Sequence, residues 1–202
     1  MALNDKGIYF IDKNTPYDYE AQYYLNFQIY SALQSLELLY SKPDTSMWKN
    51  KYQYYHYYTD HLMFSVGQIA NRFIITSKDK GLKRDLKKSN RQNFRFSENK
   101  YPILSKKGAR NTIEHIDERN QNTIRENQGV GGFCLIDTDT DPELVKRLQT
   151  KRATQPYTLD LINKELLIRN KNDDLVISLE DLKAELTTLQ KSVDALSAII
   201  VR

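Results

Sequence analysis

The strongest constraint on the fold is a long pattern of apolar and aromatic residues between positions 48 and 73. These residues, together with one threonine, recur in alternating steps of four and three: Trp48, Tyr52, Tyr55, Thr59, Leu62, Val66, Ile69 and Phe73. Such steps place side chains on one face of an α-helix. The pattern predicts a helix of about seven turns that buries this face against the rest of the protein.

A second long helix is predicted immediately before it, over residues 17–40. Its apolar residues follow the same spacing: Ala21, Leu25, Ile29, Ala32, Leu36 and Leu39. Pro43 follows this helix closely, and proline disfavours helical geometry at the residue before it. Two long helices joined by a short loop predict an antiparallel pair. The low numbers of glycines and prolines, seven and five, also favour long helices.

Two further helices are predicted downstream. A short one near residues 81–90 has few apolar anchors. A clearer one runs over residues 106–127, and the glycines at positions 129, 131 and 132 end it in the manner of a C-terminal glycine cap.

The last third of the chain has a mixed pattern. Residues 133–136 have the composition of a strand, and Asp141-Pro142-Glu143 predicts the start of a short helix to about Leu148. Residues 157–161 and 166–169 then predict a β-hairpin.

A final apolar seam resembles that of a coiled coil, with Ser178 as its N-cap. Its members are Leu175, Leu179, Leu182, Leu186, Leu189, Val193, Leu196 and Ile200. The seam is about 39 Å long at 1.5 Å per residue. It must pack on the rest of its own chain or on the same helix of a second chain.

Residues 108–120 carry the sharpest chemical signal. They read Gly-Ala-Arg-Asn-Thr-Ile-Glu-His-Ile-Asp-Glu-Arg-Asn. On a helix, the alanine and the two isoleucines form a narrow apolar stripe, and Asn111 and His115 lie roughly opposite it. Arg110 and Glu114 are four residues apart, so the carboxylate can hold the guanidinium group. The alternative to a functional role is a surface histidine in a very polar helix.

This segment resembles the Arg-x4–6-His motif of the HEPN superfamily (higher eukaryotes and prokaryotes nucleotide-binding domains). Asn111 follows Arg110 directly, and Glu114-His115-x-Asp117-Glu118 resembles the sequence of some bacterial members at this position. The resemblance covers about the first 130 residues and implies a small helical bundle. We therefore predict a mainly α fold, a HEPN-like helical bundle with a small C-terminal β-hairpin and a long C-terminal helix.

The resemblance also implies metal-independent cleavage of RNA. His115 would move protons on the 2′-hydroxyl and the leaving oxygen, since the pKa of histidine lies near neutrality. Arg110 would clamp the phosphate through its planar fork. Asn111 would orient the substrate or the histidine, and Glu114 would orient the arginine.

The spacing of the motif raises a geometrical difficulty that a dimer would relieve. On one regular helix Arg110 and His115 point about 140° apart. The resemblance implies a homodimer in which two motif helices face one another, and the final helix would offer a further dimer surface. It also implies a toxin or anti-phage defence effector, with an antitoxin or regulatory protein as a partner.

Positive charge is concentrated just before the motif. Residues 72–110 contain 13 Lys and Arg against three acids, whereas the net charge of the whole chain is only +4. Concentrated charge can attract phosphates, although a solvated loop is the alternative. The candidate RNA-binding residues are Lys83, Arg84, Lys87, Lys88, Arg91, Lys106 and Lys107.

Two other segments contain residues that could bind a metal or nucleic-acid bases, but their sequences favour structural roles. Asp137-x-Asp139-x-Asp141 begins like a calcium loop, but proline and leucine occupy the positions where glycine and glutamate are needed. His56 and Asp60, in the aromatic segment 52–61, could share a metal or a hydrogen bond. The aromatic residues there could stack on bases, but their position on the helical seam favours core packing.

Composition and motifs together give a working hypothesis. We expect two units, a HEPN-like bundle over residues 1–130 and an accessory or dimerisation unit over residues 131–202. The single cysteine and the lack of a long apolar run predict a cytoplasmic protein that does not span a membrane. No cofactor and no metal are expected. The alternative to an endoribonuclease is a non-catalytic module that binds a nucleotide, RNA or a protein partner.

Overall fold

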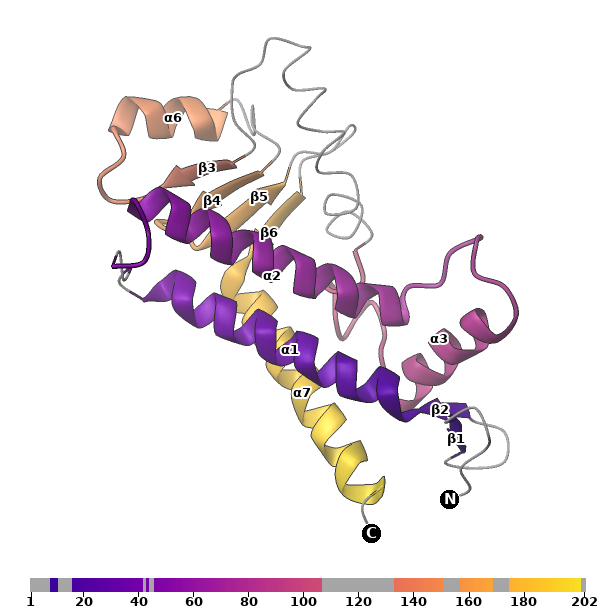
Figure 1. The fold of residues 1–202 in the computed structure, drawn as a ribbon. Coiled ribbons are helices and arrows are strands. Elements are labelled where there is room, and N and C mark those ends of the chain that lie inside the picture. Colours follow the sequence, from indigo (N-terminus) through magenta and orange to yellow (C-terminus); the bar gives the residue numbers. More distant parts are fainter. Residues whose placement is uncertain are drawn as a thin grey trace.

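The computed structural model describes residues 8–10, 16–41, 43, 46–106, 133–150, 157–168 and 175–200. Figure 1 shows their arrangement: two long helices lie side by side, a sheet covers one end of the pair, and a third long helix crosses the first.

The two predicted long helices form an antiparallel pair, as expected. Helix α1 spans Tyr19–Tyr40 and helix α2 spans Lys51–Phe73. Helix α2 begins after Asn50, whose side-chain oxygen accepts a hydrogen bond from the backbone N–H of Gln53 at 3.0 Å. The pair is joined by polar contacts as well as by its apolar seam, for example between the hydroxyls of Ser31 and Ser65 at 3.1 Å.

The prediction of a mainly α, HEPN-like bundle with only a small hairpin is wrong, because a four-stranded mixed sheet is a main part of the fold. Its strands lie in the order β3-β4-β5-β6. β3 pairs in parallel with β4, and the other neighbours are antiparallel. The bounds are Phe133–Ile136 for β3, Tyr157–Asp160 for β4, Glu165–Ile168 for β5 and Leu175–Ser178 for β6.

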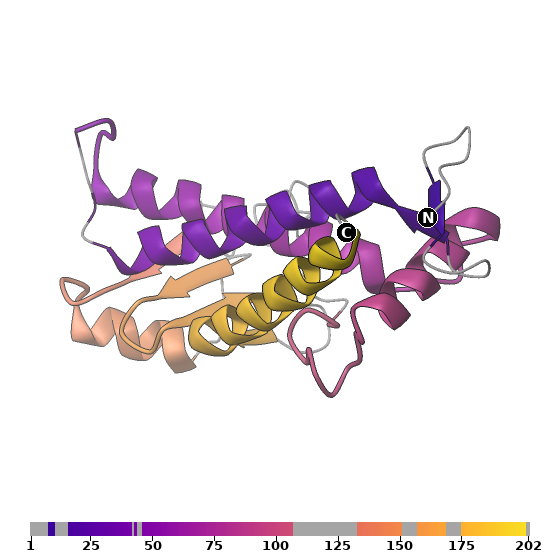
Figure 2. The same cartoon turned by 90° about the horizontal axis from the view of Figure 1, so that it is seen from below.

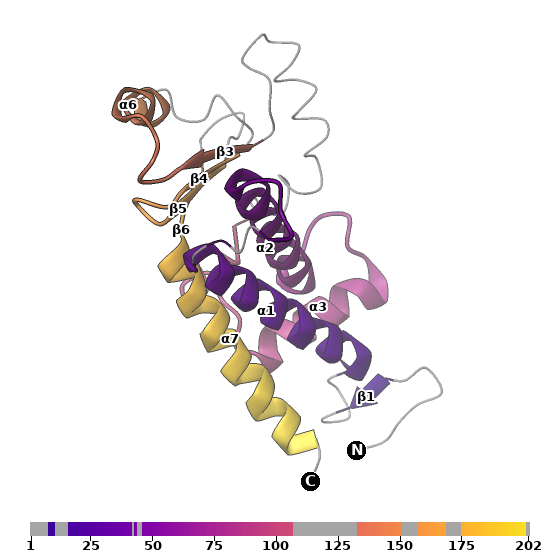
Figure 3. The ribbon, with the colours of Figure 1, turned by 60° about the vertical axis from the view of Figure 1, so that its left-hand side comes forward.

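Two features of the sequence explain this error. The expected hairpin is present as β4 and β5, but the strand at its edge, β6, was merged into the helical seam because Leu175 fits the spacing of that seam. The parallel pairing of β3 needs a crossover, and helix α6 (Pro142–Thr150) lies in it. Asp141 caps α6 as predicted, accepting from the backbone N–H of Glu143 at 2.7 Å. Figure 3 shows α6 on the far side of the sheet from α1.

The final helix packs on its own chain. Helix α7 spans Leu179–Ile200 and begins after Ser178, whose hydroxyl accepts from the backbone N–H of Asp181 at 3.2 Å. Its seam residues between positions 179 and 193 are at most 1 % exposed: Leu179, Leu182, Leu186, Leu189 and Val193. Figure 2 shows α7 lying against α1 at an angle. This part of the seam is therefore not a free dimer surface.

Helix α3 (Gly81–Asn93) lies at the far end of the α1–α2 pair from the sheet (Figure 1). It confirms the short helix predicted near residues 81–90. A small antiparallel sheet of β1 (Ile8–Phe10) and β2 (Pro16–Asp18) precedes α1.

One continuous apolar core links the helices to the sheet. It includes Ile29 of α1, Phe73 of α2, Leu166 of β5 and Leu186 of α7. The core thus contains residues from both sides of position 130, and the division into two units at that position stays a prediction. None of the described helices combines the length and the apolar composition needed to cross a membrane.

Candidate functional site

The predicted catalytic residues Arg110, Asn111, Glu114 and His115 lie outside the described residues, as does Lys107. So does the predicted helix over 106–127, apart from Lys106. The structure does describe the chain on both sides of the motif, and both flanks are held by specific contacts.

The upstream flank is held by a buried carboxylate on α7. Glu185 accepts hydrogen bonds from the backbone N–H groups of Ile103 and Leu104, at 2.8 and 3.0 Å. Burial raises the pKa of Glu185, and the two backbone N–H groups oppose that rise. Leu104 and Tyr101 are fully buried beside this contact. The chain that enters the motif is therefore fixed to α7 up to this point.

The downstream flank is held by aromatic side chains of α2. The phenol of Tyr52 donates a hydrogen bond to the backbone carbonyl of Phe133. The Phe133 ring lies parallel to the imidazole of His56, with 4.8 Å between the ring centres and 9° between the planes. Phe133 is the first described residue after the motif, so this stack fixes where the chain returns to the core.

A polar cluster lies next to this stack. Tyr157 of β4 donates its hydroxyl hydrogen to Asp60 of α2, and His56 Nε2 lies 3.0 Å from the same hydroxyl. Because that hydrogen goes to Asp60, the hydroxyl accepts from His56, which places a proton on Nε2. His56 Nε2 is also 3.4 Å from Asp60 Oδ2. The side chains of His56 and Asp60 thus share one phenol from the sheet.

The cluster is better suited to joining α2 to the sheet than to acid–base chemistry. Burial raises the pKa of the Tyr157 phenol, and the hydrogen bond to Asp60 raises it further, so the phenol stays neutral and is a poor base. Among the described residues, no group of three His, Cys, Asp or Glu side chains could hold a metal ion. We interpret the cluster as a structural clamp beside the motif's return point.

Removing the Tyr157 hydroxyl tests this interpretation. We expect Tyr157→Phe to lower the free energy of unfolding by about 1–2 kcal/mol, because a buried hydrogen bond is lost while the ring is kept. Tyr24→Phe is the matched control, since this hydroxyl lies on an exposed side chain, and should change stability by less than about 0.5 kcal/mol. Urea unfolding followed by circular dichroism measures both. Equal effects of the two substitutions would contradict a clamp.

The predicted RNA-binding cations before the motif divide into two groups. Lys83, Arg84 and Lys88 of α3 are exposed, as is Lys106. Arg91 is partly buried, and its guanidinium lies 6.0 Å from the centre of the Phe96 ring. Together, residues 72–106 hold eleven Lys and Arg against three acids, an excess of eight positive charges. We call residues 72–106 the basic lobe.

Lys87 has a different position. Its ammonium group is buried and donates to Asp79 Oδ2 at 2.9 Å and to the carbonyl of Ile74 at 2.8 Å. Asp79 also accepts from the backbone N–H of Thr76 at 2.7 Å. Lys87, followed by the Thr76 N–H, holds the pKa of Asp79 well below its usual range. Lys87 is thus occupied inside the protein, where it fixes the start of α3, and we leave it out of the RNA-binding surface.

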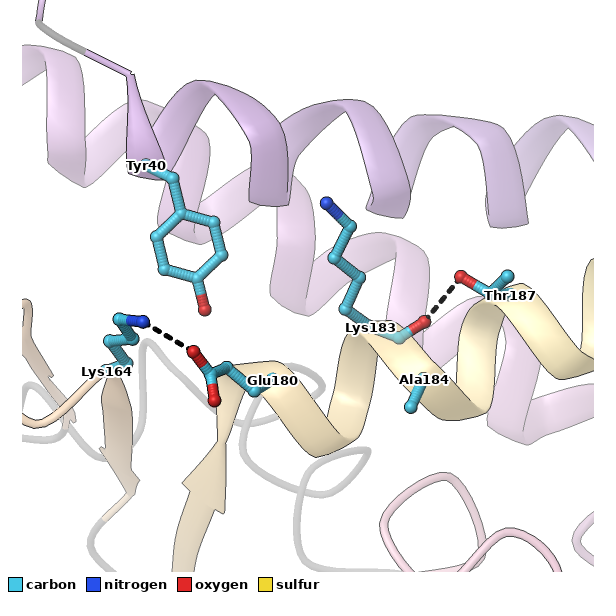
Figure 4. Close-up of a pocket in the computed structure, with 6 residues that line it drawn as sticks. All are labelled: Tyr40, Lys164, Glu180, Lys183, Ala184 and Thr187. Carbon is cyan, nitrogen blue, oxygen red and sulfur yellow. Dashed lines mark hydrogen bonds and ion pairs between the residues drawn. The ribbon is translucent and has the colours of Figure 1, made fainter.

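A pocket of about 580 Å³ lies between the end of α1, the β4–β5 turn and the first turns of α7 (Figure 4). Its charged groups neutralise one another: Lys164 pairs with Glu180, and Lys183 lies 3.9 Å from Glu37 of α1. Burial, helped by the charge of Glu180, raises the pKa of the Tyr40 phenol that forms one wall. The pocket presents neither an uncompensated charge nor a reactive base, and we assign it no part in the chemistry of the motif.

We compared the chain with models of known protein families, with curated proteins and with solved structures, and none of the three comparisons found a match.

The sequence interpretation missed two of the residues that hold the site's flanks. Tyr157 lies 97 positions from Asp60, and Glu185 lies 82 positions from Ile103, so no local spacing connects them. The only signal for Glu185 was its place beside the buried seam of α7. His56 and Asp60 were recognised as a pair that could share a hydrogen bond, but without their third member.

Proposed function

We propose that this protein binds RNA through the basic lobe and cleaves it without a metal, using Arg110 and His115. The observation that carries the proposal is the exposed cluster of cations on α3, Lys83, Arg84 and Lys88, in the stretch of chain that leads into the motif. Lys106, also exposed, precedes Arg110 by only four positions.

The fixed position of α3 supports this role. The buried Asp79–Lys87 pair anchors the first turns of the helix, so that its exposed cations are presented from a rigid element. Because the backbone of the helix is already ordered, binding of phosphates costs these cations only side-chain entropy. The proposal depends on the chemistry of the motif and on the lobe, and it does not require a helical-bundle fold.

The chemistry assigned to the motif is transfer of the RNA phosphate to its own 2′-oxygen. His115 moves the proton from the 2′-hydroxyl or to the leaving 5′-oxygen, and Arg110 balances the charge of the phosphate in the transition state. Asn111 orients the substrate or the imidazole, and Glu114 orients the guanidinium. The products are a 2′,3′-cyclic phosphate and a free 5′-hydroxyl.

In the non-catalytic alternative, the protein binds RNA through the basic lobe but does not cleave it. The exposed charge of the lobe supports binding of RNA by itself, whatever the motif does. The biological role implied by the resemblance, a toxin or a defence effector controlled by an antitoxin or regulatory protein, belongs only to the catalytic version. In that version, expression of the wild-type chain would arrest growth, and expression of His115→Ala would not.

Cleavage is tested with EDTA-treated protein on total RNA, on tRNA and on a labelled single strand. We expect wild type to leave 2′,3′-cyclic phosphate ends, and His115→Ala and Arg110→Ala each to lower the rate by about 10²–10⁴-fold. If folded wild type does not cut, or if all three proteins cut equally, the catalytic proposal fails.

Binding is tested in the same series with one pair of matched charge reversals. Arg84→Glu, on the lobe, should weaken RNA binding by about tenfold at low salt and reduce its salt dependence. Lys191→Glu, an exposed cation of α7 outside the lobe, should leave binding nearly unchanged. Equal affinities for these two variants would remove the lobe from the proposal.

A further inference from the structure

Six aromatic rings lie exposed on the outer side of the α1–α2 pair. Five of them are between 43 % and 65 % exposed, and His61 is exposed among them. We call this surface the aromatic face; its members are Tyr23, Phe27, Tyr30, Tyr57, His61 and Phe64. Rings of this size are usually buried, and a contiguous exposed apolar patch marks an interaction site.

The six rings belong to one surface because of the helical spacing. On α1, positions 23, 27 and 30 share a face, and on α2, positions 57, 61 and 64 do the same. The Ser31–Ser65 contact joins the two helices, and Tyr30 and Phe64 directly precede these serines. Because the helices are antiparallel, the two stripes meet near this contact and extend from it toward opposite ends of the pair. They form one band on the side of the pair opposite the buried core.

The charge of this surface selects the kind of partner. Between positions 21 and 59, only Glu37 is charged on α1 and only Lys51 on α2; Asp60 and Arg72 are the other formal charges of α2. Nucleic acid that stacks on aromatic rings also needs cations along its backbone, and the aromatic face has none. An uncharged surface, in contrast, meets a copy of itself without repulsion between like charges.

The exposed area of the rings reaches the low end of the range for a specific interface. An aromatic side chain buries 150–250 Å² when it is fully covered, so six half-exposed rings offer about 600 Å² per copy. A standard interface buries about 800 Å² per partner, and tyrosine and phenylalanine are enriched in its core. The neighbouring Gln34 and Gln68 would supply the polar rim.

We propose that the aromatic face pairs with the same face of a second copy of this chain. The contact is a two-fold arrangement in which the α1–α2 pairs of two copies form a four-helix interface. It differs from the dimer surface expected on the final helix, whose seam is buried within its own chain. The proposal does not depend on RNA binding or on cleavage.

The test is the oligomeric state of the full chain by sedimentation equilibrium over a wide concentration range. We expect wild type to be a dimer, and Phe27→Glu and Phe64→Glu each to raise the dissociation constant by roughly 100-fold or more, since every substitution occurs twice in the interface. The matched control is Leu144→Glu, on an exposed leucine of α6 outside the aromatic face, and it should remain a dimer.

Circular dichroism checks that each variant is folded, which is expected because both phenylalanines are exposed. A monomeric wild type would overturn the proposal, and so would a dimer that Phe27→Glu and Phe64→Glu leave intact. A monomer that still cleaves RNA would leave the proposed function standing. A dimer that neither binds nor cleaves RNA, and that the two substitutions dissociate, would support the pairing of the aromatic faces and contradict the proposed function.

Discussion

Replacing Glu185 by alanine is expected to lower the free energy of unfolding by about 2–5 kcal/mol, because two buried backbone N–H groups lose their acceptor. These N–H groups belong to Ile103 and Leu104, and the carboxylate that serves both lies on α7. Urea unfolding gives the difference in free energy.

Two further variants serve as an intermediate case and as a control for Glu185→Ala. Glu185→Gln keeps one acceptor oxygen and should cost about 1 kcal/mol, whereas Lys191→Ala, on the exposed side of the same helix, should cost less than about 0.5 kcal/mol. If Glu185→Ala behaves like Lys191→Ala, the carboxylate does not hold the upstream flank.

The same residue gives stability a pH dependence of known sign. The pKa of Glu185 is raised in the folded protein by burial, so the folded state binds this proton more tightly than the unfolded state does. The stabilisation is present below the ordinary glutamate pKa and is lost as pH rises through the raised value. Glu185→Gln should remove this downward slope from the plot of unfolding free energy against pH, compared with wild type.

Replacing Leu186 by alanine is expected to cost about 2–5 kcal/mol through loss of burial and the cavity that remains. Leu186 is fully buried in the core shared by α1, α7 and the sheet. Because the seam of α7 packs within its own chain, the loss should be independent of protein concentration. A loss that disappears at low concentration would mean that the seam holds two chains together.

The helices could be predicted from the sequence because their signals are local. The 4–3 spacing of α1 and α2, the Ser178 cap and the Asp141-Pro142-Glu143 start of α6 are all signals between near neighbours in the sequence. The sheet was harder, since its β3–β4 pair joins strands more than 20 positions apart and a parallel pair leaves no turn signal. Strand β6 was missed because Leu175 lies four positions before Leu179 and so continues the apolar spacing of α7.

In the candidate site, too, local sequence signals could be recognised and long-range contacts could not. The Arg110–His115 motif and the excess of cations can be seen in the sequence, but the buried position of Lys87 cannot, because Asp79 and Lys87 read as two ordinary charges of a basic stretch. Burial of both groups depends on how α3 packs against the end of α2. The aromatic residues of α2 were expected in the core, and only some are there: Tyr54 and Tyr55 are buried, whereas Tyr57 is exposed.

The packing of α7 on α1 has a consequence for the synthesis of the protein. Asn26 of α1 accepts a hydrogen bond from Gln190 of α7, 164 positions later, at 2.6 Å. The side of α1 that packs on α7 thus leaves the ribosome long before its partner helix, and the nascent chain exposes that side until α7 is made. We expect a chain that ends before α7 to expose it permanently and to aggregate more readily than the full chain.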